Sequence, residues 1–292
     1  MESVGYKLYF QSLSGSVPLI HSDTLYSMVY TALGHLGVLS DGQPEFGFSL
    51  SSAFPFYQDF LFFPIPLDFR NNTGRQITLP SAQLFISENL LLLYLQEKLS
   101  KELPVFQSGC LLAEESHPLH FVYPIWKNQR MHAGNTTMNY LRFINDAGLF
   151  FLARFGTEKE QTIFETALNF LQDEGIGKNR TIGAGAFQWK KFTCPCSESL
   201  TKKHLLLSAY LPDETELEDN ALLNCSIEWS RRTITPYFNS DKESKCMLMA
   251  KEGSIIKGEV TRLKGSTVKV FNENKKLGTQ TAVYRFGKAF FL

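Results

Sequence analysis

The sequence predicts an α+β fold, and three observations lead to this prediction. Two segments, which begin near residues 22 and 157, show the apolar spacing of amphipathic helices. Segments with the alternation or the short apolar runs of strands lie before and after each of them. Hydrophobic residues make up 43% of the 292 residues and charged residues 20%, a composition that is sufficient for a folded core.

The opening of the chain indicates a strand followed by a helix. Residues 6–13 (YKLYFQSL) alternate between apolar and polar side chains, as a half-buried strand does. Residues 21–23 (His-Ser-Asp) then offer a helix N-cap. Apolar residues recur at helical spacing from Leu25 to Leu36, and Gly37 ends the pattern. We therefore expect the first helix to begin at the Ser22-Asp23 pair.

The remaining elements of the first unit follow the same plan. Residues 46–51, 149–155 and 186–192 read as three further strands. A second helix begins at Thr157, where Glu160 completes a capping box. The resulting order is β-α-β-β-α-β, which is the ferredoxin-like (RRM-like) plan.

An insertion and a second unit complete the predicted organisation. A polar, proline-rich stretch at about residues 64–145 interrupts the first unit and contains one helical piece, residues 88–99. Further strands are predicted after residue 195, at residues 203–210, 225–231, 245–250 and 282–286. We therefore predict two ferredoxin-like units, residues 1–195 with the insertion and a degenerate unit at residues 196–292. A single α+β domain with a small β annex is the alternative.

The net charge and the number and spacing of the cysteines argue against some classes of protein. Lys+Arg and Asp+Glu both total 29, which argues against bulk coating of nucleic acid but allows a local basic groove. The chain shows no signal peptide, and its most apolar window, residues 90–95, is too short to span a bilayer. Five irregularly spaced cysteines favour a reduced, cytoplasmic protein. The Cys194-Pro-Cys196 pair reads as a turn or strand end, with a metal site as the alternative, and we expect no cofactor.

A glycine-rich stretch after the second helix is the most informative motif. Residues 173–187 read DEGIGKNRTIGAGAF, with four glycines between residues 175 and 185 and with Lys178 and Arg180 among them. Glycine permits positive φ and lets the backbone approach a ligand, and successive N–H groups can bind an anion such as a phosphate. The alternative is a flexible loop with a helix C-cap at Gly175. The stretch leads from helix to strand, so it is neither a Walker loop nor a dinucleotide fingerprint.

Six stretches together resemble a known family. In chain order they are HSDTLYSMVYTAL, then FSLSSAFPF with FFPIP, then GIGKNRTIGAGAF, then GSIIKGEV, and finally VYRFGKAFFL. By these stretches the chain resembles the RAMP superfamily of CRISPR proteins, whose mark is a glycine-rich loop between the second helix and the fourth strand of a ferredoxin-like unit. Within it, the chain is most similar to the fourth Csm-series subunits of type III-A effector complexes. Residues 68–145 match poorly, as insertions in this family do.

The resemblance implies a role and a set of partners. Such a subunit holds the five-prime handle of the guide RNA and joins the large polymerase-like subunit to the first backbone RAMP subunit, in antiviral defence. It is non-catalytic, and we expect no metal site in this chain. The insertion acts as a thumb that pushes between guide and target, so contact with target RNA is indirect. No membrane is involved.

The resemblance also implies which residues contact RNA. The glycine loop should meet handle phosphates, and the start of the first helix should lie near the same RNA, since a helix N-terminus also favours phosphate. Asp23 would cap the helix or bind a base edge or 2′-OH. The insertion adds the basic segment WKNQRMHAGNTTMNY as a thumb hairpin. The residues expected to contact RNA are Ser22, Asp23, Thr24, Ser51, Ser52, Lys127, Arg130, His132, Gly175, Gly177, Lys178, Asn179, Arg180, Gly183 and Gly185.

Two other classes of function stay open at this point. One is a guide-RNA-processing endoribonuclease of the same superfamily, with His21 as the base that activates a 2′-OH and His132 as its partner. No acid and base stand at a spacing that forces them together, so we prefer a non-catalytic protein. The other is a scaffold or nucleotide-binding protein without RNA contact.

Overall fold

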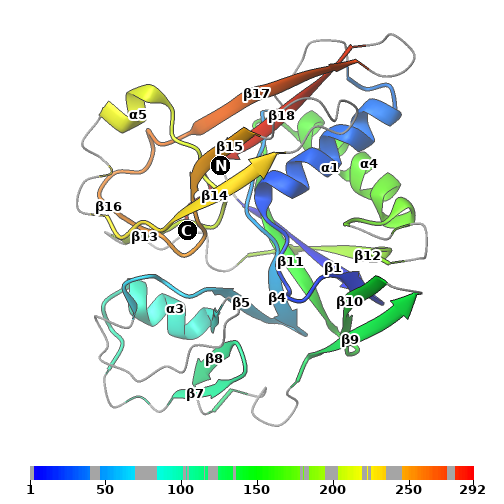
Figure 1. Ribbon diagram of the computed structural model, residues 1–292. Coiled ribbons are helices and arrows are strands. Elements are labelled where there is room, and N and C mark those ends of the chain that lie inside the picture. Colours follow the sequence, from blue (N-terminus) through cyan, green and yellow to red (C-terminus); the bar gives the residue numbers. More distant parts are fainter. Residues whose placement is uncertain are drawn as a thin grey trace.

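The computed structural model of the chain shows one continuous α+β body in which the insertion and the C-terminal half flank a central sheet (Figure 1). The residues that the structure describes are 3–39, 47–69, 84–100, 103, 105–114, 116–117, 124–133, 136–177, 180, 184–194, 203–218, 222, 225–234, 245–274 and 280–292. In this part of the chain, no helix is long and apolar enough to cross a membrane.

The central sheet begins with the strands of the predicted first unit. β1 (Val4–Phe10) lies between β12 (Phe187–Thr193) and β11 (Ala147–Arg154), and both pairings are antiparallel. On its other side β11 pairs with β3 (Ser49–Leu50) and β4 (Phe54–Tyr57), again antiparallel. In order of appearance in the unit, the strands therefore lie as fourth, first, third and second. The strand predicted at residues 46–51 is shorter than expected and resumes in β4.

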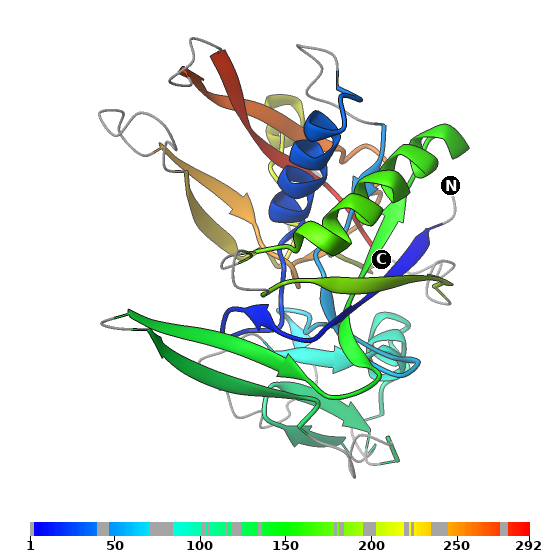
Figure 2. The same cartoon turned by 90° about the vertical axis from the view of Figure 1, so that its right-hand side faces the viewer.

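Two long helices cover one face of this sheet. α1 (Ser22–His35) and α4 (Glu158–Glu174) lie side by side above β1, β11 and β12 (Figure 2). α4 begins with the predicted capping box, because the Thr157 hydroxyl accepts from the Glu160 N–H and the Glu160 carboxylate accepts from the Thr157 N–H. The start of this helix is thus fixed by a signal within four residues of sequence.

Part of the predicted insertion continues the central sheet instead of standing apart from it. β5 (Phe60–Pro64) pairs with β4, then β6 (Phe85–Ser87), β8 (Leu111–Glu114) and β7 (Val105–Ser108) follow in space. Among the described residues, nine strands belong to this sheet. α3 (Glu88–Leu95) packs on β5 and β6, within the helical piece expected at residues 88–99. The apolar run of β5 explains the continuity, because it is buried on both faces.

The rest of the insertion is a hairpin. β9 (Trp126–Ala133) and β10 (Thr136–Phe143) pair in antiparallel register, and β2 (Leu13–Ser14) joins β10 at the base. This three-stranded sheet lies below the central sheet, on the side away from α1 and α4 (Figure 2). The strand predicted at residues 6–13 is therefore divided between β1 in one sheet and β2 in another.

The described C-terminal half consists mainly of three two-stranded sheets. They are formed by β13 (Lys203–Leu205) with β16 (Ile255–Lys257), β14 (Trp229–Ile234) with β15 (Lys245–Ala250), and β17 (Gly265–Asn274) with β18 (Gln280–Lys288), and one short helix, α5 (Glu214–Glu218), lies beside them. The strand predicted at 245–250 has the bounds of β15, and the one at 282–286 lies within β18. The strands predicted at 203–210 and 225–231 are shortened and shifted, and β16 and β17 were not predicted.

The largest hydrophobic core cluster contains residues of both halves, and a smaller separate cluster lies within the C-terminal half. Phe286 of β18 is buried and stacks on Tyr26 of α1, with ring centroids 5.2 Å apart. Near the C-terminus, the Phe290 ring lies under the Arg154 guanidinium, which also donates to the Phe291 carbonyl. The predicted boundary at residue 195 lies outside the described residues. On the described side, the core passes from the first half to the second without interruption.

We expect Phe286→Ala to lower the free energy of unfolding by about 3 kcal/mol or more, because it opens a cavity between α1 and β18. Urea unfolding measures the loss. Leu248→Ala is the control, since Leu248 is an exposed side chain of the same half, and we expect it to cost less than about 0.5 kcal/mol. Equal effects of the two substitutions would show that the halves do not share a core.

Candidate functional site

The glycine loop is held rigidly at both ends. Gly175 caps α4 with a φ of 75°, and its N–H donates to the Leu171 carbonyl at 2.8 Å. Gly185 has a φ of 84°, and a Cβ there would stand 1.9 Å from the Ile176 carbonyl oxygen. The Gly185 N–H donates to the Ser12 carbonyl at 2.8 Å. These two glycines are therefore required by the fold, and their N–H groups are already used within the chain.

The middle of the loop is more open. Gly177 has a φ of 88°, and a Cβ there would meet only the Leu13 side chain, at 3.9 Å. The Arg180 side chain is half-exposed, with its guanidinium 3.9 Å from the Glu174 carboxylate. So long and exposed an ion pair contributes little, and the guanidinium can turn to another anion. Lys178, Asn179 and Gly183 lie outside the described residues.

A short segment connects the loop to the base of the hairpin. Ser12 accepts the bond from Gly185, and the next two residues form β2, which pairs with β10. The Gly15 N–H then donates to the Asn139 carbonyl of β10 at 2.9 Å. The structure thus brings the glycine loop and the hairpin together, although about 30 residues of β11 and α4 separate them in sequence.

The hairpin carries cations on both faces. Lys127 and Arg142 are directly opposite one another in the register, so both project from one face, and both are exposed. Arg130 pairs with Asn139 and projects from the other face, because side chains alternate along a strand. His132 lies in β9, but its side chain is outside the described residues.

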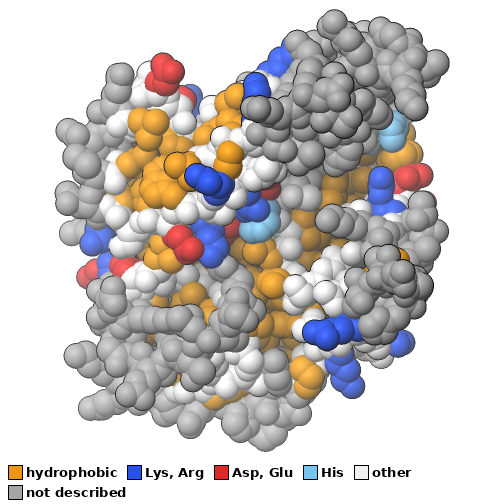
Figure 3. Space-filling view, in the orientation of Figure 1, with side chains coloured by type: hydrophobic (Ala, Val, Ile, Leu, Met, Phe, Trp, Pro, Cys, Tyr) orange, Lys and Arg blue, Asp and Glu red, His pale blue; other side chains and the backbone are white. Residues whose placement is uncertain are grey.

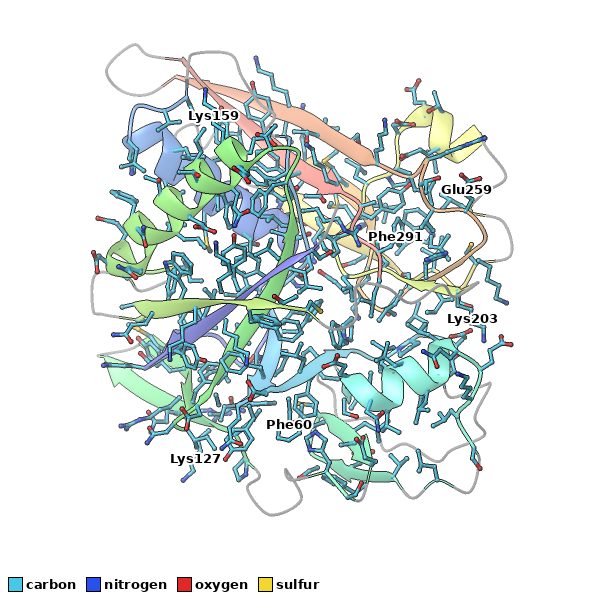
Figure 4. All side chains as sticks on the ribbon, turned by 180° about the vertical axis from the view of Figure 1, so that it is seen from behind. Phe60, Lys127, Lys159, Lys203, Glu259 and Phe291 are labelled. Atoms are coloured by element: carbon cyan, nitrogen blue, oxygen red, sulfur yellow. The ribbon has the colours of Figure 1, made fainter. Side chains whose placement is uncertain are left out.

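Arg142 is a candidate that sequence reasoning missed. The alternation of the segment NYLRF on the second hairpin strand could have identified it as the partner of Lys127. Figure 3 shows Lys and Arg side chains gathered at the lower right, where Figure 1 has the hairpin. Lys127 is labelled at the edge of the molecule in Figure 4.

The serines at and near the start of α1 are buried and bonded within the chain. The Ser22 N–H donates to the Ser52 hydroxyl at 2.8 Å, and the Ser22 hydroxyl accepts from the Ala209 N–H at 2.9 Å. Ser51 accepts from the Leu152 N–H and donates to the carbonyl of Ser52. Their hydroxyl groups therefore connect α1, the central sheet and the C-terminal half.

Asp23 is also bonded within the chain. One carboxylate oxygen accepts from the Thr24 N–H at 2.9 Å, and the other binds the guanidinium of Arg285 in β18. Its side chain is 1% exposed. Of the predicted contacts in the Ser22–Asp23–Thr24 group, Thr24 is the one that is partly exposed. Arg285 was not identified from the sequence, because it lies 262 residues from its partner.

The network at α1 centres on Glu252, which sequence reasoning also missed. Its carboxylate is completely buried and accepts from the Ser52 hydroxyl at 2.5 Å and from Nδ1 of His21 at 2.8 Å. Burial alone would raise the pKa of Glu252. The hydrogen bond from His21, the charge of His21 and the hydrogen bond from Ser52 outweigh burial and lower this pKa to about 2. Glu252 is therefore ionised at neutral pH although it is buried.

Comparison with known proteins shows which known fold this chain has. No protein-family model and no curated protein matches the chain. Over its whole length, however, the chain has the fold of subunits from type III-A CRISPR-Cas interference complexes.

The matched subunits are Csm4 chains, and the fold of this chain is therefore Csm4-like. With the Csm3-Csm4 subcomplex the TM-score is 0.67 at 17% identity, covering 100% of this chain and 98% of that chain. With the Csm1-Csm4 cassette in complex with cA3 it is 0.60 at 18% identity, covering 100% and 97%. With the same cassette in complex with AMPPNP it is 0.59 at 18% identity, with the same coverage.

Gly177 in the open middle of the glycine loop and Gly185 at its tightly packed end give a matched pair of substitutions. Gly177→Ala should cost about 1 kcal/mol, because it adds only the strain of a positive φ. Gly185→Ala should cost at least twice as much, since its Cβ also collides with the Ile176 backbone. Urea unfolding of both variants measures the difference. Equal costs would contradict the rigid anchoring of the loop at Gly185.

Glu252 should give the stability a characteristic pH dependence. Because its folded pKa is below the unfolded value of 4.5, the ionised carboxylate stabilises the fold above that pH, and this contribution is lost as the pH falls toward 2. The shift corresponds to about 3 kcal/mol. The difference in free energy of unfolding between wild type and Glu252→Gln should therefore shrink from about pH 5 to about pH 2.5.

Glu228→Gln is the control for that titration. Glu228 is half-exposed and pairs with Lys251 at 3.3 Å, so its removal should change the free energy of unfolding by less than about 1 kcal/mol. A pH profile of Glu252→Gln parallel to that of wild type would contradict the role given to the buried carboxylate.

Proposed function

We propose that this chain is the Csm4-type RAMP subunit of a type III-A CRISPR interference complex. The observation that carries the proposal is the fold match along the whole chain to Csm4 chains in two different assemblies, one with Csm1 and one with Csm3. A chain of this fold that meets both partners would bridge the large subunit and the backbone subunits. Antiviral defence is the process in which such a complex acts.

In this proposal, the chain also holds the five-prime handle of the guide RNA. The hairpin and the glycine loop support it, because the hairpin places exposed Lys127 beside Arg142 and the loop adds half-exposed Arg180, on a chain whose net charge is zero. Lys127 and Arg142 would bind phosphates from one face of the hairpin and Arg130 from the other. Arg180 would bind phosphate from the loop. Phosphate contacts of this kind position an RNA strand without reading its sequence.

The proposal includes the division of the chain into two ferredoxin-like units. The antiparallel order fourth, first, third, second, with α1 and α4 on one face, supports a ferredoxin-like first unit. The hairpin β9–β10 is the segment suited to act as the thumb between guide and target. The C-terminal half would be the degenerate second unit, reduced to paired strands around the shared core.

The proposed subunit is not an enzyme. The buried groups at the start of α1 support this, since Ser22, Asp23 and Ser52 all have structural partners within the chain. A guide-processing endoribonuclease is the alternative, and His21 is the group that would serve as its base. A scaffold or nucleotide-binding protein without RNA contact is the second alternative, which the following experiment separates from the proposal.

Lys127→Ala/Arg142→Ala should weaken binding of guide RNA by the assembled complex. The chain is co-expressed with its neighbouring effector subunits, and affinity for guide RNA with and without the handle is measured across a salt series. Each lost phosphate contact should reduce the slope of log affinity against log salt by about 1. The variant should therefore lose handle-dependent affinity and about two units of slope.

Lys159→Ala/Lys257→Ala is the matched control, because both lysines are exposed and lie on α4 and β16. It should bind as wild type does. Co-purification with both neighbouring subunits tests the structural part of the proposal separately. Normal assembly with unchanged handle binding in the hairpin variant would favour the scaffold alternative.

A further inference from the structure

The hairpin formed by β14 and β15 has one inward face and one outward face. Side chains alternate along each strand, and residues opposite one another in the register share a face. On the inward face, Met249 is completely buried and Met247 packs against Val270 of β17. On the outward face, Ala250 is buried in the smaller core cluster. The other five residues of that face are all exposed, namely Trp229, Arg231, Thr233, Cys246 and Leu248.

The outward face is more apolar than a solvent-facing side of a sheet usually is. In an antiparallel sheet, the face toward water normally carries polar side chains. Here Trp229 is 44% exposed and Leu248 is 58% exposed. β15 also contains a continuous apolar run, Cys-Met-Leu-Met-Ala at residues 246–250. Such a run is typical of a strand that is covered on both faces, whereas the described part of the chain covers mainly one.

Trp229, Arg231 and Leu248 form one continuous patch, which we call the outward patch. Leu248 is directly opposite Arg231, so Trp229 is its diagonal neighbour on the same face. Diagonal neighbours lie about 7–8 Å apart, which is within reach of an aromatic side chain. In the described part of the chain, no carboxylate forms an ion pair with Arg231. The patch is therefore apolar, with one positive charge available to a partner.

This composition favours a protein partner over an RNA strand. The cores of protein interfaces are enriched in aromatic residues and arginine and depleted of lysine and carboxylates. Arg231 is the one charged residue of the outward face. RNA is bound mainly through several phosphate contacts, which a single cation does not provide. The partner should therefore present apolar side chains, with a carboxylate opposite Arg231.

The direction of the hairpin indicates which neighbour covers the patch. In Figure 2 the hairpin β14–β15 and the hairpin β9–β10 both extend toward the left, and in Figure 1 both lie toward the viewer. In the proposed function, β9–β10 is the thumb between guide and target, and the backbone subunits hold the guide beyond it. A backbone subunit on this side of the chain would therefore also meet β14–β15.

We propose that the outward patch docks the backbone RAMP subunit, with Trp229 and Leu248 against an apolar surface of that subunit and Arg231 paired with one of its carboxylates. This inference rests on the proposed function, because it assumes that the chain assembles with such a subunit. It assigns one of the two bridging contacts to named residues. Docking supplies the second cover that the apolar run of β15 lacks in the isolated chain.

The test measures the dissociation constant of the full chain with the backbone subunit and, separately, with the large subunit. Trp229→Ala and Leu248→Ala should each weaken the pairing with the backbone subunit by about tenfold or more, because each removes an apolar anchor of the interface. Pairing with the large subunit should stay within about twofold of wild type. Leu217→Ala is the matched control, since Leu217 of α5 is also a leucine that is 58% exposed.

Urea unfolding of the same variants separates docking from folding. Because Leu248 is exposed in the isolated chain, Leu248→Ala should keep the unfolding midpoint of wild type while it loses affinity for the backbone subunit. If Trp229→Ala lowers the midpoint, Leu248→Ala decides the question.

Arg231→Ala tests the charge of the patch. The affinity of wild type for the backbone subunit should fall as salt is added, because salt screens the ion pair, and this dependence should flatten in Arg231→Ala. Arg262→Ala is the control, since it removes another exposed cation of the C-terminal half, and it should keep the salt dependence of wild type.

The outcomes separate this inference from the proposed function. Assembly of wild type with both neighbours, together with unchanged pairing of Trp229→Ala and Leu248→Ala, would overturn the inference and leave the proposed function standing. Loss of pairing with the large subunit instead would also overturn it, and so would loss of guide RNA binding by variants that assemble normally. Failure of wild type to assemble with either neighbour would overturn both.

Discussion

The structure depends on one buried carboxylate at the junction of its two halves. Glu252 follows β15 in the C-terminal half, yet its hydrogen-bond partners are His21 and Ser52, which belong to the N-terminal half. An ionised carboxylate without such partners would be very costly to bury. The same junction contains the Asp23–Arg285 pair and the stacked Tyr26 and Phe286 rings. Polar bonds thus fix the register of the halves, and apolar packing supplies the bulk of the stabilisation.

At this junction, most polar groups at the start of α1 are bonded within the chain and buried, and few are exposed. The hydroxyl groups of Ser22 and Ser52 and the carboxylate of Asp23 hold the halves together, whereas the His21 side chain is partly exposed. The glycine loop is divided in the same way. Gly175 and Gly185 are needed for close backbone approach, and the exposed charge nearby comes from Arg180. Most residues of a motif that resembles a ligand-binding sequence can therefore serve to hold the fold together, with few of them facing solvent.

Local signals in the sequence predicted local structure well. The capping box at Thr157, the hairpin with its cations and the order of the first unit's elements all depend on residues that are close in sequence. Glu252 and Arg285 could not be found in this way, because their partners lie 231 and 262 residues away. The strands predicted at 203–210 and 225–231 were misplaced for a related reason, since short paired strands gain their stability from the core on which they pack. All the predicted RNA contacts stay predictions, and Lys178, Asn179 and Gly183 among them lie outside the described residues.

Nuclease protection of the guide RNA tests the central claim most directly. The effector complex is assembled with and without this chain, and the protected positions of the guide are mapped in each. If the chain holds the handle and bridges its neighbours, its omission should expose the handle and release the large subunit, while the backbone subunits still protect the rest of the guide. Unchanged protection of the handle in a complex that lacks this chain would contradict the account.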